Sequence, residues 1–287
     1  MESDASRSLQ FDASQFYDSP DLSDVTIVLV EDSDEAEERA AKRQRTGDGA
    51  DGAQDAVDAA AAGAAADRPT VRLHGHKFLL CACSSVMKTR IANWSHGDGN
   101  DLVLHVPSLE VGQLLIRSLY QAQPQLQDCS QQQLLELMVL SESLDASKAV
   151  SAASTQLQLA AAQGQLEWHT ALHIMSLPAA CPEMPAYKPL FEAAAALIQT
   201  ELGDLDVACL DVEVKWPKLL DLPHMALLQL LSHDETRAAH ENTVVYVIQQ
   251  WAEAQQQQAS LQQLQQLCGT IRMARCSPLY VATVLPA

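Results

Sequence analysis

The pattern of apolar and polar positions divides the chain into a strand-containing part and a longer helical part. Val25–Val30 is a β-branched run that is apolar on both faces, which is typical of a buried strand at the centre of a sheet. Val71–Leu73 and Leu102–Val106 predict two further strands, and the last of them ends at Pro107. We therefore expect a small sheet in the first half of the chain.

Two helices are expected beside these strands. His76–Ser85 leads into a helix that carries Met87 and Ile91 among its apolar residues. After the third strand, Ser108 is a favourable N-cap residue, and Val111 begins an apolar stripe along one face of the helix that follows. That stripe predicts a helix that packs on the sheet.

The chain after Pro124 is expected to be helical to its end. Ser130 and Gln133 have the spacing of a capping box at a helix N-terminus. Further helices are expected to begin near Asp145, Trp168, Pro189, Leu219 and Glu241, with stops at Pro178 and near Pro217. In the helix that begins at Glu241, a core-facing stripe repeats at helical spacing and comprises Val244, Val247, Ile248 and Trp251.

The segment Glu31–Pro69, between the first two strands, has almost no large apolar residue. It cannot bury enough surface to offset its ordering entropy, so we predict a disordered insert. Within it, Lys42–Arg45 has two interpretations that stay open, a nuclear import signal or a solvated charge cluster. Gly47–Gly52 matches a phosphate-binding glycine pattern in letters only, because its flanks are of low complexity and two aspartates lie inside it. We expect no nucleotide site there.

Charge and cysteine content narrow the possible functions. The formal net charge is −19, which removes the electrostatic attraction that dominates nucleic-acid binding. Seven cysteines, an odd number without a Cys-x-x-Cys pair, do not indicate a disulfide framework and fit a reducing compartment. Met1–Gln10 lacks the apolar core of a secretory signal. We expect no nucleic-acid or membrane partner and a cytoplasmic and/or nuclear location.

Several residues are of types suited to metal binding or catalysis. Four possible zinc ligands lie close together in the sequence: His74, His76, Cys81 and Cys83. Their spacing is tighter than structural zinc sites use, which favours structural roles. His169 and His173 share a helix face, but no third ligand is visible. No nucleophile stands beside a plausible base, so we expect no catalytic residue, cofactor or metal.

The first half of the chain resembles the BTB/POZ fold. The resemblance is carried, in order, by Ser23–Val25, Leu73–Leu80, Ser84–Ser85, Leu102–Pro107, Leu119–Tyr120 and Leu134–Leu144. It implies structural roles for Asp24, His76 and Tyr120. The fold it implies is a small mixed sheet with helices.

The second half resembles the BACK domain, which is all-helical. The resemblance is carried by Ala171–Pro178, Leu219–Pro223, Leu230–Asp234, Glu241–Val244 and Trp251, the last as a structural position. The whole chain is most similar to plant and algal POZ/BTB proteins with a BACK domain and a Phe-rich N-terminal segment, here Phe11–Tyr17. Together the two resemblances imply an α+β protein with a helical second domain.

The resemblance also implies a domain plan. Residues 1–19 form an N-terminal dimer arm, residues 20–160 form the BTB/POZ domain interrupted by the insert at 31–69, and residues 161–287 form the BACK domain. Four apolar residues in and after the arm are too few for a core of their own and are expected to cover the partner subunit of a homodimer: Phe11, Phe16, Tyr17 and Leu22.

By resemblance, the chain is expected to be a protein-interaction adaptor and not an enzyme. The finer expectation is a substrate-specific adaptor of a cullin-3 E3 ubiquitin ligase, which binds cullin through Met87, Ile91 and Asn93 and recruits a protein target. Cullin contacts in this family often use an apolar residue followed two positions later by Glu, and no Glu occurs between Met87 and Asp101. The alternative is therefore a BTB-dimer scaffold or transcription-associated adaptor that does not bind cullin.

Overall fold

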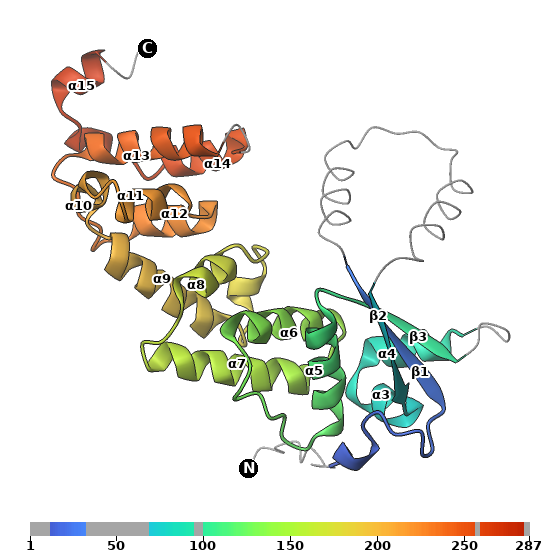
Figure 1. Ribbon diagram of the computed structural model, residues 1–287. Helices are drawn as coiled ribbons and strands as arrows, with labels where there is room; N and C mark the ends of the chain where they lie inside the picture. The colour runs from blue at the N-terminus through green and yellow to red at the C-terminus, as the bar shows by residue number, and fades with distance from the viewer. Residues whose placement is uncertain (1–11, 33–68, 95–99, 256–258, 284–287) are drawn as a thin grey trace, which may run out of the picture. The chain divides into compact units, whose positions relative to one another are not determined.

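The computed structural model describes residues 12–32, 69–94, 100–255 and 259–283 (Figure 1). Contacts divide the chain into two compact units, Met1–Gln156 and Leu157–Ala287. The first unit holds a three-stranded sheet and its helices, and the described part of the second is helical.

The sheet has β1 (Val25–Glu31) at its centre, as the sequence predicts. β1 pairs antiparallel with β2 (Thr70–Gly75) and parallel with β3 (Asp101–Val106), so the sheet is mixed. Four apolar side chains of β1 are buried, namely Val25, Ile27, Val28 and Leu29. A strand that is covered on both faces needs apolar residues on both, which explains the continuous run.

The predicted insert needs a correction at its ends. Glu31 is the last residue of β1, where it pairs with Val106, and its N–H donates to the carbonyl of Pro69 at 3.1 Å. Glu31 therefore belongs to the sheet, the N–H of Asp32 after it donates to the carbonyl of Val106 at 2.9 Å, and Pro69 accepts its hydrogen bond directly before β2. The rest, residues 33–68, including Lys42–Arg45 and Gly47–Gly52, lies outside the described residues.

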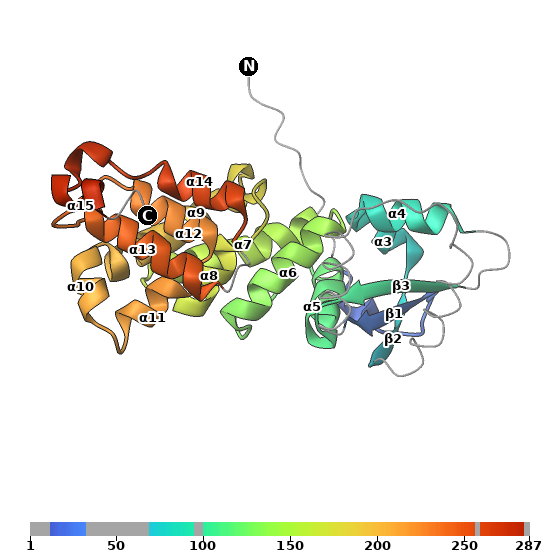
Figure 2. The same ribbon diagram turned by 90° about the horizontal axis from the view of Figure 1, so that it is seen from above.

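The segment after β2 forms two helices that lie side by side, α3 (Lys77–Cys83) and α4 (Ser85–Ala92) (Figures 1 and 2). The helix predicted to carry Met87 and Ile91 is α4, whereas the separate α3 was not predicted. Ser84 divides them because its backbone is extended, at φ −148° and ψ 121°. Its hydroxyl oxygen accepts from the N–H of Met87 at 3.0 Å, which caps α4.

Helix α5 (Leu109–Tyr120) packs on the sheet, as predicted. The Ser108 hydroxyl oxygen caps it by accepting from the N–H of Val111 at 3.2 Å. A Cβ added at Gly112 would lie 3.0 Å from Val106 Cγ1 and 3.1 Å from Leu29 Cδ1. The close approach of helix and sheet therefore favours glycine at this position, since a larger residue would push Val106 or Leu29 aside.

Two longer helices complete the first unit and lead into the second, α6 (Gln131–Ser143) and α7 (Ser147–Ala162). The predicted capping box is confirmed: the Ser130 hydroxyl accepts from the Gln133 N–H, and the Gln133 side chain accepts from the Ser130 N–H. The boundary between the two units, at residues 156 and 157, falls within α7.

The helices of the second unit are α8 (Trp168–Met175), α9 (Lys188–Leu202), α10 (Leu205–Leu210), α11 (Lys215–Leu220), α12 (His224–Ser232), α13 (Glu241–Ala254), α14 (Leu261–Cys268) and α15 (Pro278–Thr283). The predicted stop at Pro217 and start at Leu219 are wrong. Pro217 lies in the first turn of α11, where its missing N–H has no intrahelical role. Helices α10, α12 and α14 were not predicted.

The core of the second unit contains the predicted stripe of α13, and all four of its residues are buried. Trp251 donates from Nε1 to the carbonyl of Leu222 at 2.8 Å, so its one polar atom is paired inside the core. Among the described helices, none combines the length and apolar character needed to cross a membrane.

Candidate protein-interaction surfaces

Ser23 and Asp24, directly before β1, form hydrogen bonds to the start of α3 and the residues before it. The Asp24 carboxylate accepts from the N–H of Lys77 at 2.7 Å and so caps α3 from another part of the chain. The Ser23 hydroxyl donates to the carbonyl of Gly75 at 3.0 Å. These contacts are structural and involve the residues that carry the resemblance at this position.

The half-buried His76 and the buried Tyr120 form a polar node, a small hydrogen-bonded cluster, at this junction. His76 Nε2 lies 2.9 Å from the carbonyl oxygen of Asp21, which can only accept, so Nε2 carries the proton. In the neutral imidazole Nδ1 then accepts from the Tyr120 hydroxyl at 3.0 Å, and that hydroxyl accepts from the His76 N–H at 3.0 Å. Burial raises the pKa of Tyr120 to about 12. Both ring nitrogens of His76 are thus occupied, which leaves neither for zinc.

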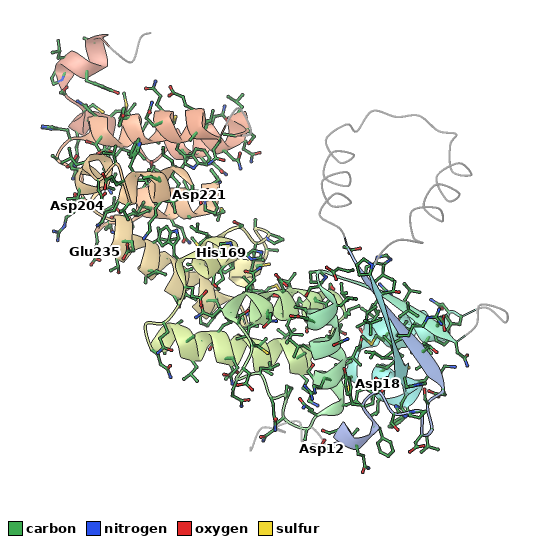
Figure 3. The ribbon with its side chains drawn as sticks, viewed as in Figure 1. Asp12, Asp18, His169, Asp204, Asp221 and Glu235 are labelled. Carbon is green, nitrogen blue, oxygen red and sulfur yellow. The ribbon has the colours of Figure 1, made fainter. Side chains whose placement is uncertain are left out.

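The N-terminal arm packs on this node within its own subunit. The ring of Phe16, in the 3-10 helix η1 (Ser14–Phe16), meets the His76 ring at 5.7 Å, and the ring of Tyr17 meets that of Tyr120 at 6.1 Å. The Asp18 carboxylate, labelled in Figure 3, accepts from the N–H of His74 at 2.9 Å. Phe16 and Tyr17 therefore find part of their contacts without a partner subunit.

Two apolar side chains at the same junction are open to solvent. Leu22 is 82 % exposed and Phe78 is 80 % exposed. Leu22 follows Asp21, whose carbonyl oxygen lies 2.9 Å from His76 Nε2, and Phe78 is two residues after His76. Exposed large apolar side chains that lie together often mark a contact surface. Phe11, the remaining predicted arm residue, lies outside the described residues.

Phe78 was not predicted as a contact residue. The signal in the sequence is weak, since a phenylalanine in the first turn of an amphipathic helix usually faces the core. Leu22 and Phe78 are called the Leu22 surface below.

The α4 side of the first unit requires a correction for Met87. Its side chain is fully buried, so it supports the helix and cannot touch another protein. Ile91 is half-buried and Asn93, the C-cap of α4, is exposed, so both can be reached from outside. Of the three residues predicted to contact cullin, Ile91 and Asn93 are therefore accessible to another protein, and Met87 is not.

Trp94, next to them, was not predicted. It is half-buried, and the ammonium of Lys77 lies 4.9 Å from the centre of its ring. The sequence feature that could have indicated Trp94 is an aromatic residue in an otherwise polar stretch after a helix. Ile91, Asn93 and Trp94 are called the α4 surface below.

The second unit has a groove of about 420 Å³ between α9 and α12. Its walls are mainly apolar, with Phe191 and Ile198 from α9 and Leu230 from α12, and Lys188 and His233 also line it. The predicted pair His169 and His173 lies on α8 with ring centres 6.5 Å apart. Among the described residues, no group of three or more potential metal ligands comes together.

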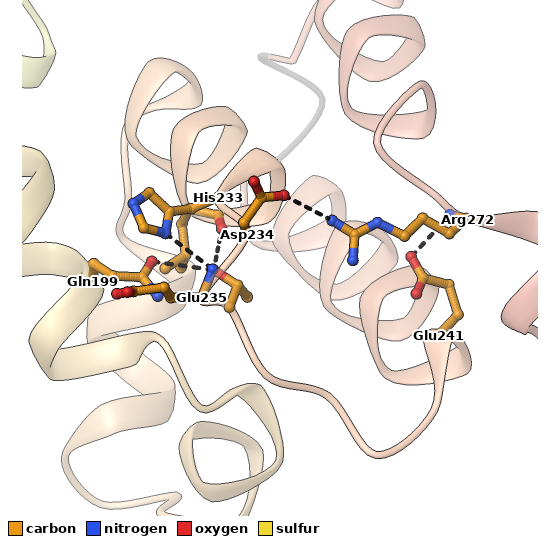
Figure 4. Close-up of polar contacts among 8 residues, drawn as sticks. Gln199, His233, Asp234, Glu235, Glu241 and Arg272 are labelled. Carbon is orange, nitrogen blue, oxygen red and sulfur yellow. Dashed lines mark hydrogen bonds and ion pairs between the residues drawn. The ribbon is translucent and has the colours of Figure 1, made fainter.

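The turn after α12 is held by polar contacts (Figure 4). The Arg272 guanidinium lies 3.8 Å from the Asp234 carboxylate, and the Arg272 N–H donates to the buried Glu241 carboxylate at 2.8 Å. The Thr236 hydroxyl lies 3.1 Å from Gln199 Oε1 on α9. These contacts join three helices and their connections, so we assign them a structural role.

Both units expose large apolar side chains, which are typical of surfaces that contact other proteins. Comparison with protein families agrees: residues 64–160 match the BTB/POZ domain, and residues 213–286 match BACK, the domain described as BTB And C-terminal Kelch. The chain therefore contains a BTB/POZ domain followed by a BACK domain. Proteins with these domains are typically non-enzymatic adaptors, and BTB domains typically dimerise and bind other proteins. A search of curated proteins found no significant match.

The BTB/POZ match begins only at residue 64, although β1 and the N-terminal arm precede it. β1 nevertheless pairs with β2 in full register, Val25 opposite Gly75 and Val30 opposite Thr70. A long segment separates β1 in sequence from residues 64–160, which match the family. In the folded chain β1 nevertheless pairs with β2, which lies in that match. The likeness to plant and algal proteins stays a prediction.

Proposed function

We propose that the chain is a homodimeric adaptor that links a cullin-3 E3 ubiquitin ligase to a target protein. The observation that carries the proposal is the succession of a BTB/POZ and a BACK domain in one chain. The BTB/POZ unit would supply the dimer contact and the cullin contact, and the BACK unit would position the target. The chain itself catalyses nothing, and its contribution is binding energy from apolar contacts at these surfaces.

The α4 surface supports the cullin part of this proposal. Ile91 and Asn93 occupy the positions of the family's apolar residue and Glu, and both are accessible. The Leu22 surface supports the dimer part, because two exposed apolar side chains lie beside the N-terminal arm. A cytoplasmic or nuclear location belongs to the same proposal.

A second candidate function is a BTB-dimer scaffold that does not bind cullin. It is favoured by Asn93, since a neutral amide replaces the carboxylate of the family pattern. A hydrogen bond to a neutral acceptor is weaker than one to a charged acceptor.

Calorimetric titration of cullin-3 into the full chain distinguishes the two candidates. The adaptor gives saturable heat at one cullin per chain, and a scaffold gives none. Light scattering on the same sample tests the dimer independently, because a monomeric mass would reject both functions in their dimeric form.

A further inference from the structure

The second unit carries an exposed apolar surface that its own fold does not cover. It is formed by the end of α10, the connection to α11, and α13. Its exposed apolar side chains are Val207, Leu210, Val212, Val214 and Tyr246. Leu210 is 82 % exposed, although it ends a helix whose Leu205 and Ala208 are buried. We call this set the Leu210 surface.

A groove of about 440 Å³ crosses this surface. Leu210 and Tyr246 line it together with Asp206, Thr243 and Tyr280. The Tyr246 ring stacks on Trp216 with centres 5.7 Å apart and planes 12° apart, which fixes its orientation. A rigid aromatic ring beside an exposed leucine is the composition that anchors protein contacts.

Asp206 places a fixed negative charge in the wall of the groove. One of its carboxylate oxygens accepts from the Thr243 hydroxyl at 2.9 Å, and the other accepts from the N–H of Ala239. Each oxygen keeps lone pairs for a further donor. Because the carboxylate is already oriented, an incoming ammonium or guanidinium group would meet it without a reordering cost.

The surroundings are acidic as well. Residues 204–215 contain Asp204, labelled in Figure 3, Asp206, Asp211 and Glu213, against the single base Lys215. Among the described residues, none of these four carboxylates forms an ion pair. Glu213 is also exposed. The surface therefore selects a basic partner through its charge and an apolar one through Leu210 and Tyr246.

This charge argues against a second copy of the chain as the occupant. A twofold contact pairs a surface with itself, which would set these carboxylates against their own copies. A nucleic acid or an anionic membrane would be repelled in the same way. A short protein segment with an apolar side chain and a neighbouring Lys or Arg satisfies both features.

We propose that the Leu210 surface docks such a segment of a target protein, with the apolar side chain against Leu210 and Tyr246 and the basic side chain against Asp206. The inference rests on the proposed adaptor role, since it assigns the surface that holds the target. The inference adds the chemistry of the target segment, which is an apolar residue close to a Lys or Arg.

The test uses short random peptides displayed against the full chain. The enriched peptides are expected to combine an apolar residue with a nearby Lys or Arg. In fluorescence anisotropy with an enriched peptide, Leu210→Asp should weaken binding by at least about tenfold. Glu213→Gln, which changes only an exposed charge, should weaken it less and reduce its dependence on salt.

Leu261→Asp is the matched control, because Leu261 is an exposed leucine on α14 outside this surface. It should leave peptide affinity unchanged. Enrichment of uncharged or acidic peptides, or equal affinity for native chain and Leu210→Asp, would overturn the proposal. A lower oligomeric mass of Leu210→Asp would also overturn it, by making the surface a contact between copies.

Cullin-3 titration of the same variants separates this inference from the proposed function. Leu210→Asp should bind cullin-3 as the native chain does. If the native chain binds no cullin-3 but binds the peptides through Leu210, the ligase role fails and the docking surface stands. If the native chain binds cullin-3 but its affinity for the peptides does not depend on Leu210, the docking surface fails and the ligase role stands.

Discussion

The hydroxyl oxygen of Tyr120 lies 3.0 Å from both the backbone nitrogen and the Nδ1 atom of His76. One side chain at the end of α5 therefore satisfies two polar atoms at the start of α3, far away in sequence. In the N-terminal arm, the ring of Phe16 contacts the His76 ring and the ring of Tyr17 contacts the Tyr120 ring. The contact joins three segments of the BTB/POZ unit.

Replacing Tyr120 with Phe should therefore destabilise the first unit. The change leaves the half-buried N–H of His76 without its acceptor, which costs about 1 kcal/mol. Urea denaturation measures the loss. Tyr246→Phe is the control, since Tyr246 is nearly half exposed, and it should change the free energy of unfolding by little. An unaltered midpoint for Tyr120→Phe would contradict the assigned role of the node.

Ser84→Ala should also destabilise the first unit. The buried Ser84 hydroxyl accepts from the N–H of Met87 and donates to the carbonyl of Leu144, so its removal unpairs both groups. The expected cost is about 1–2 kcal/mol. Ser151→Ala on the exposed face of α7 is the matched control and should be nearly neutral. Equal melting temperatures for the two variants would show that the division between α3 and α4 does not depend on this cap.

The stability of the second unit should depend on the protonation of His224. Burial lowers the pKa of His224, so the folded chain holds it neutral where the unfolded chain takes up a proton. Its contribution is present above the usual histidine pKa and is lost as the pH falls below that value. His224→Gln should therefore reduce the loss of stability between neutral and mildly acidic pH.

Chemical denaturation at several pH values checks this prediction. His169→Gln is the control, because His169 is exposed on α8 and should leave the pH dependence as it is. If His224→Gln and the native chain lost stability in parallel, the burial of His224 would not be the cause.

The dimer should depend on the Leu22 surface. Combined Leu22→Asp and Phe78→Asp substitutions place charges on exposed apolar positions and should give monomers by light scattering. Leu22 has a φ of 60°, a conformation that Asp tolerates better than Leu, so the fold should survive. If the doubly substituted chain remained dimeric, the Leu22 surface would not be the dimer contact.

Phe16→Asp is a less selective test of the dimer, because Phe16 also contacts His76 inside its own subunit. Leu261→Asp again serves as the control for an added surface charge and should remain dimeric.

Cullin-3 binding should depend on the α4 surface. Ile91→Ala should weaken the affinity by about 2 kcal/mol, roughly thirtyfold in Kd, because it truncates an apolar anchor. Asn93→Glu should tighten it by about 1 kcal/mol by supplying a charged acceptor. Calorimetry measures both, with melting curves as a check on the half-buried Ile91. Absence of binding for the native chain and for Asn93→Glu alike would reject the ligase and leave the scaffold.

The sequence alone determined the elements whose signals are local. The apolar run of β1, the capped helix α5, the capping box of α6 and the stripe of α13 were predicted and are present. Their residues interact within a turn or two, or reveal burial by their period, so neighbours in sequence carry the information. The order of these elements and the motifs between them also sufficed to indicate the BTB/POZ and BACK domains.

Only the tertiary structure decided what depends on residues far apart. Met87 proved to be buried although it lies close to the accessible Ile91, and Ser84, which divides α3 from α4, donates to the carbonyl of Leu144 directly after α6. The short helices α10, α12 and α14 escaped prediction, since helices of this length are stabilised mainly by packing. Leu210 and Tyr246 meet at one groove for the same reason: burial and exposure follow from contacts between elements, which no local pattern records.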